Sequence, residues 1–189
     1  MTSIDLKQLF DNIIGKTYDE TLREYKIFDS INTDSVYSEC SNTEMIFQDP
    51  LPFGKNTKML CNCVNTTVMI GGFEAFAALS LYSDTKNDII TRCIVSIGEP
   101  KNVNKYRSEQ VVRSSICSYF EKYYGKNYML EDSLELTLIA WDIDEKKILL
   151  YCVSKIGKIS LQLYDKKDRN ATDALDRIRV KKCTSQLNG

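Results

Sequence analysis

Hydrophobic residues recur at helical spacing near the start of the chain, and the sequence also marks where each helix begins and ends. A first helix is predicted over 4–14, with Ser3 as its N-cap and a glycine directly after it. A second is predicted over 17–26, where Thr17 and Glu20 stand at the spacing of a capping box. Only two residues separate the helices, so this part of the chain is expected to form a helical hairpin.

Further along, apolar and polar residues alternate, as they do in strands with one buried face. The strands predicted from this alternation are 73–83, 88–97, 133–141, 147–153 and 158–164. Shorter strands are expected near 36–40 and 44–48, and one or two strands within 57–70, with a break near Asn65. A third amphipathic helix, predicted over 108–124, separates the two groups of strands.

This order of elements predicts an α+β fold. A helical hairpin is followed by an antiparallel meander, and then come a helix and a three-stranded antiparallel meander. The turns between strands are of hairpin length, whereas parallel crossovers need longer connections. The chain therefore divides into residues 1–99 and residues 100–189, the second ending in a basic tail, and the two parts are expected to pack as one compact unit.

Both parts contain a similar sequence at the end of a predicted helix. Residues 10–18 and 120–128 share one pattern of nine positions. It begins with a phenylalanine, an acidic residue and a variable residue, continues with two apolar or aromatic residues and Gly-Lys, and ends with a variable residue and a tyrosine. A tandem duplication explains this pattern, and so does the general use of Gly and Lys at helix C-termini. With this turn and the helix-then-meander layout, the chain resembles the modules of β-lactamase-inhibitory protein and of small outer-membrane assembly lipoproteins. The resemblance implies a concave sheet that binds another protein, although the lipid-attachment signal of the lipoproteins is not seen here.

Charge is distributed unevenly along the chain. The formal net charge is −1, but residues 1–50 carry −6 and the remainder +5. The whole chain has no basic character that would indicate nucleic-acid binding. Solvated surface explains the acidic region, and so does an acidic face that docks a basic partner protein. In the second case, Asp11, Asp19 and Glu20 are expected to contact the partner.

The chain has no histidine and seven cysteines. The absence of histidine excludes Ser-His-Asp and Cys-His catalysis and every metal site that needs an imidazole ligand. An odd number of widely spaced cysteines favours reduced thiols over a disulfide framework. The N-terminus has no leader pattern, and no apolar run is long enough to cross a membrane. A cytoplasmic protein without membrane contact is therefore expected.

Cysteine, aspartate, glutamate and lysine could still form two kinds of metal site without histidine. Cys61 and Cys63, with Cys40 and Cys93, supply four thiols for zinc, but zinc ligands usually come as wider pairs on knuckle turns. A divalent-metal nuclease often ends its ligand set in Glu-x-Lys on a strand. The three such triplets begin at Glu24, on a predicted helix, at Glu99, beside a proline, and at Glu145, in a predicted turn. We therefore expect no metal and no cofactor.

Aromatic residues supply the remaining candidates for function. Tyr119 and Tyr123 lie on the third predicted helix, Tyr128 follows it, and Trp141 points to the opposite side from Leu138. These side chains either seal the core or form an interaction surface. The sequence thus favours a non-catalytic protein-binding module of inhibitor or immunity type. A divalent-metal hydrolase or nuclease using Asp, Glu and Lys is the alternative, and a structural subunit of a larger assembly is a third; the oligomeric state stays open.

Overall fold

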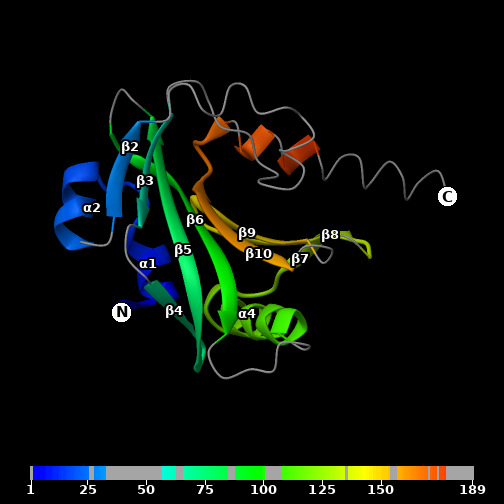
Figure 1. Ribbon diagram of the computed structural model, residues 1–189. Helices are drawn as coiled ribbons and strands as arrows, with labels where there is room; N and C mark the ends of the chain where they lie inside the picture. Colours follow the sequence, from blue (N-terminus) through cyan, green and yellow to red (C-terminus); the bar gives the residue numbers. More distant parts are fainter. Residues whose placement is uncertain are drawn as a thin grey trace.

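One twisted sheet organises the molecule, as the computed structural model in Figure 1 shows. The structure describes residues 2–25, 28–32, 57–62, 66–84, 88–100, 108–134, 136–153, 157–169, 171–173 and 175–177. The strands expected near 36–40 and 44–48 lie outside these residues.

Ten strands of the described chain pair into this sheet, in the order β1-β4-β5-β6-β10-β9-β8-β7, with β3 joining β2 to the second part of β5. The strands are β1 (Thr2–Asp5), β2 (Phe28–Asn32), β3 (Thr57–Asn62), β4 (Thr66–Ile70), β5 (Phe73–Asp84), β6 (Ile90–Pro100), β7 (Tyr128–Asp132), β8 (Leu136–Ile143), β9 (Lys146–Val153) and β10 (Lys158–Asp165). The helices are α1 (Leu6–Asn12), α2 (Tyr18–Glu24) and α4 (Ser108–Tyr124). Among these described strands only β1 and β4 pair in parallel, and the α+β prediction is confirmed.

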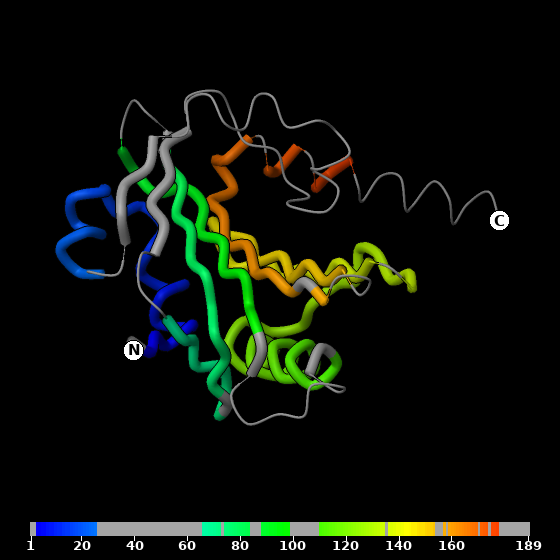
Figure 2. The backbone as a smooth tube through the Cα atoms, in the orientation of Figure 1, coloured from blue at the N-terminus to red at the C-terminus, as the bar shows by residue number. Residues whose placement is uncertain are grey.

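The sheet has two parts that meet where β6 and β10 pair antiparallel. Each part contains a helix and a meander, α1 with β4 to β6 and α4 with β7 to β10, whereas β1, β2, β3 and α2 occur in the first part alone. In Figure 2 the strands of the second part cross those of the first at a steep angle. Phe10 and Phe120, which occupy the same place in the repeated sequence, stack with 5.8 Å between ring centroids and 4° between planes. A tandem duplication predicts such an arrangement, and the duplication itself stays a prediction.

The main core lies between the sheet and the two helices α1 and α4. Alternate residues of β5, β6, β9 and β10 point into it, as the sequence alternation predicted. Across the central pair of strands, for example, Leu161 lies opposite Val95. From the helices, Phe10 and Phe120 fill the space above these strands. Both halves of the chain therefore contribute to one continuous core.

The opposite face of β7 to β10 is also buried, contrary to the prediction of a meander with one buried face. Its core residues are Leu130, Leu138, Ala140, Leu149, Tyr151, Val153, Tyr164, Ala171 and Leu175. The last two come from helical turns after β10 that cover this face. Arg92, which is 1% exposed, fixes them by donating from Nε and NH2 to Asp168 at 3.0 and 2.8 Å. The basic tail thus begins as a packed layer.

Several elements differ from the prediction because long-range pairing decides them. The first helix begins at Leu6, and its N-cap is Asp5, whose carboxylate accepts from the Gln8 amide at 2.8 Å. Ser3 lies instead in β1, which pairs with β4 about sixty residues further on. Strands β2 and β7 are likewise absent from the prediction: β2 pairs with β3 about thirty residues further on, and the pattern of burial in β7 is broken by a bulge. The Thr17–Glu20 capping box is confirmed, with both reciprocal hydrogen bonds present.

Candidate functional site

Two of the predicted tyrosines lie side by side on the outer part of α4. Tyr119 is 8% exposed and Tyr123 is 43% exposed, so the first belongs to the core and the second faces solvent. Their rings meet edge to face with 5.0 Å between centroids, and Tyr119 meets Phe120 in the same way. Tyr123 is therefore an exposed aromatic ring that packs against the buried ring of Tyr119.

A groove of about 610 Å³ runs between this face of α4 and the turn that joins β4 to β5. Its lining consists of Gly71, Gly72, Ser114, Ser115, Ser118, Tyr119, Lys122 and Tyr123. In Figure 1 the turn is at the lower end of β5, beside α4. Tyrosine with serine and glycine is the composition of antibody paratopes, since tyrosine offers rigid contact area and the small residues offer adaptable hydrogen bonds.

Close contact between the turn and the helix gives the groove its floor. Gly71 has φ +55°, and a Cβ at this position would lie 3.0 Å from Cδ2 of Tyr119. The turn can therefore approach the helix because residue 71 is glycine. On its other side Tyr119 is fixed to α1, because its hydroxyl accepts from the Lys7 amide at 3.3 Å. Burial, with the nearby charge of Asp5, raises the pKa of Tyr119 to about 12, so this hydroxyl stays protonated.

Positive charge surrounds the exposed ring of Tyr123. The ammonium groups of Lys7 and Lys122 each lie 5.3 Å from its centroid. Lys7 also forms an ion pair with Asp11, and the hydrogen bond from Lys7 to that carboxylate is the main reason why its pKa is raised. Lys122, in contrast, is in no ion pair among the residues that the structure describes. It is the only charged side chain among the described groove-lining residues.

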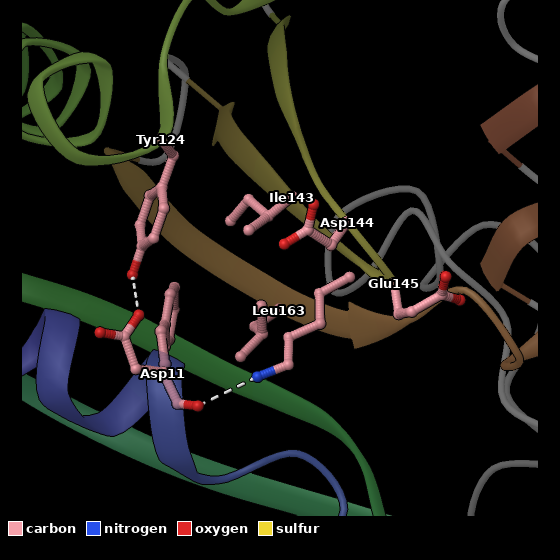
Figure 3. Close-up of a pocket in the computed structure, with 8 residues that line it drawn as sticks. Asp11, Tyr124, Ile143, Asp144, Glu145 and Leu163 are labelled. Atoms are coloured by element: carbon pink, nitrogen blue, oxygen red, sulfur yellow. Dashed lines mark hydrogen bonds between the residues drawn. The ribbon is translucent and has the colours of Figure 1, made fainter.

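Asp11 lies at a second cavity, where the ends of α1 and α4 meet the turn between β8 and β9. The cavity measures about 260 Å³, and Figure 3 shows its residues. The Tyr124 hydroxyl donates to the Asp11 carboxylate at 2.8 Å, and Lys146 Nζ donates to the Asp11 carbonyl oxygen at 3.1 Å. Asp144 turns its carboxylate towards this space, whereas that of Glu145 points away from it (Figure 3).

The hydrogen-bonded pair Asp11 and Tyr124 in this second cavity has shifted pKa values. Partial burial raises the pKa of Asp11, but hydrogen bonds from Lys7 and Tyr124 and the charges of Lys7 and Lys146 outweigh it, so the pKa lies below its ordinary value. For Tyr124, burial and the hydrogen bond to Asp11 raise the pKa. An ionised carboxylate and a protonated phenol of this kind do not exchange protons near neutral pH.

The other predicted residues do not join this surface. Trp141 was expected to be an exposed anchor or to pack under a second layer, and it is 0% exposed. It lies in the main core against Phe120, with 5.4 Å between centroids, because β8 is buried on both faces. Tyr128 packs at the border of the second core. Asp19 and Glu20 are exposed on α2, well apart from α4 in Figure 1, and Glu20 serves the capping box.

The described thiols have no feature of a reactive or metal-binding site. Burial raises the pKa of Cys93, and burial followed by the charge of Glu121 raises that of Cys117. No group of three or more His, Cys, Asp or Glu side chains that could hold a metal occurs among the described residues. Of the four thiols in the zinc hypothesis, those of Cys40, Cys61 and Cys63 lie outside the part of the structure that is described.

Sequence reasoning found the tyrosines of the groove but missed its small residues. The signal was present, because Ser114, Ser118 and Lys122 follow one another at intervals of four on one side of a helix. That Gly71 and Gly72 lie opposite them depends on the tertiary fold. No helix in the described chain has both the length and the apolar character that crossing a membrane requires. Comparisons with protein-family models, curated proteins and solved structures found no match.

Proposed function

We propose that this chain is a cytoplasmic, non-catalytic module that binds a partner protein in the groove between α4 and the β4–β5 turn. The observation that carries the proposal is the groove itself, with its exposed Tyr123 ring above a fixed floor of Tyr119 and Gly71. Binding energy at protein interfaces concentrates on such anchored aromatic residues. Because the floor is built from core contacts, little ordering is needed when a partner binds.

The lack of catalysis in this proposal is supported by the protonation states near the surface. Asp11 is held ionised, and Tyr119 and Tyr124 are held protonated. A general acid or base needs a pKa near the working pH. The inhibitor or immunity role belongs to the same proposal, since such proteins act by occupying a partner rather than by chemistry.

A bulky residue placed in the groove tests this function. Ser118 is exposed and lines the groove, whereas Gln110 is exposed on the same helix but does not line it. Ser118→Trp and Gln110→Trp therefore add a bulky ring at two places. Affinity capture from the native host should retain a stoichiometric partner with the wild-type chain and with Gln110→Trp, and lose it with Ser118→Trp. Equal retention by both variants would refute the proposed site.

A further inference from the structure

We infer that the groove accepts an acidic, extended segment of the partner, with a carboxylate beside Lys122 and neighbouring residues against the ring of Tyr123. This inference deepens the proposed function and rests on it. One of the two interpretations of the acidic region in the sequence was a basic partner bound by Asp11, Asp19 and Glu20. In the structure, however, Asp11 is engaged by Lys7 and Tyr124, and Glu20 is engaged by Thr17.

The first argument is charge complementarity. The described groove-lining residues contain one cation, Lys122, and no carboxylate. Lys7 adds positive charge at the same tyrosine ring, but Asp11 largely balances it. Asp5 is also close enough to affect Tyr119 and Lys7. Neither of these carboxylates lines the groove, and Lys122 is the one charge of the described lining that has no ion-pair partner, so a partner carboxylate would match it without breaking an existing ion pair.

The second argument is the pattern of hydrogen-bond donors and the length of the groove. Three serine hydroxyls and an ammonium group line α4 on this side, and all of them can donate to carboxylate or carbonyl oxygens. From Ser114 to Lys122 the helix advances by about 12 Å. This length corresponds to roughly four residues of extended chain. A short extended segment can therefore lie along the helix, while the exposed glycines of the turn form the opposite wall.

The test uses a random decapeptide library displayed on phage, which is selected on the full chain and, in parallel, on Lys122→Glu. The wild-type chain should enrich peptides rich in Asp and Glu, and Lys122→Glu should enrich Lys and Arg instead. Synthetic copies of the enriched acidic peptides are then titrated by fluorescence polarisation. Lys122→Ala should weaken their binding about two- to fivefold, the range for one exposed charge pair. Lys126→Ala, an exposed lysine outside the groove lining, should leave binding unchanged.

The outcomes separate this inference from the function on which it rests. Basic or neutral peptides that bind the wild-type chain and are blocked by Ser118→Trp would overturn the acidic segment and leave the groove as the binding site. Acidic peptides that bind Lys122→Ala as tightly as the wild type would also overturn it. Peptides that bind equally well to the wild type and to Ser118→Trp would overturn both.

Discussion

Replacing Gly71 by alanine tests how the groove is built. Residue 71 has φ +55°, and the left-handed conformation costs about 1–2 kcal/mol for a residue with a Cβ. The new Cβ would also stand 3.0 Å from the Tyr119 ring, and overpacking of this kind typically costs about 1–3 kcal/mol. Because the two costs add, the free energy of unfolding should fall by about 2–5 kcal/mol.

Gly125→Ala is the matched control. Gly125 has φ +81°, and a Cβ added there would have no other atom within 4 Å, so alanine at this position meets backbone strain alone. Urea unfolding can be followed by the fluorescence of Trp141, which is the chain's single tryptophan and is fully buried. Gly71→Ala should be less stable than Gly125→Ala by at least about 1 kcal/mol. If the two variants lose equal stability, the turn does not rest on Tyr119 and the groove has a different floor.

Three further predictions concern charge and protonation. Asp168→Ala removes the carboxylate that pairs with the buried Arg92, and the free energy of unfolding in urea should fall by about 3–5 kcal/mol. The control Asp173→Ala changes an exposed residue and should leave the free energy of unfolding almost unchanged. Equal losses would contradict the buried ion pair. The difference in absorbance at 295 nm between the wild type and Tyr119→Phe should report a tyrosine that ionises at about pH 12. Because the pKa of Tyr119 is raised in the folded state, its contribution to stability should be lost above about pH 10, where the unfolded chain ionises first, and Tyr119→Phe should lack this loss. The pKa of Asp11 is lowered in the folded state, so the ionised carboxylate stabilises the fold above its ordinary pKa. This stabilisation is lost on acidification. The stability of Asp11→Asn should therefore depend less on pH below about pH 4 than that of the wild type.

Elements that depend on neighbouring residues alone could be predicted from the sequence. The 108–124 helix has apolar residues at helical spacing and a glycine at its end, and the structure places α4 over the same residues. The Thr17 capping box also needs only neighbouring residues. Strand β1, in contrast, has one apolar residue that becomes buried, and it forms because Ile4 pairs with Val68 far along the chain.

The second core could not be predicted from alternation alone. In β9 every residue from Lys147 to Val153 is buried, because α4 covers one face and the turns after β10 cover the other. The position of Trp141 depends on the same burial of both faces. The sequence placed its side chain on a surface or under a second layer, and in the structure it lies in the main core. Only part of the groove could be predicted from the sequence. Its tyrosines follow from the pattern of the helix, whereas the position of its glycines opposite the helix depends on the tertiary fold.

Site-specific crosslinking tests the central claim most directly. A photoreactive benzoylphenylalanine in place of Tyr123 puts the probe at the groove by exchanging one exposed aromatic ring for another, and the same residue at Asp19 places it on the exposed acidic helix α2. With the partner from the native host, the groove claim predicts a discrete adduct from position 123, mapped by mass spectrometry to an acidic segment, and none from position 19. An adduct from position 19 alone would contradict it.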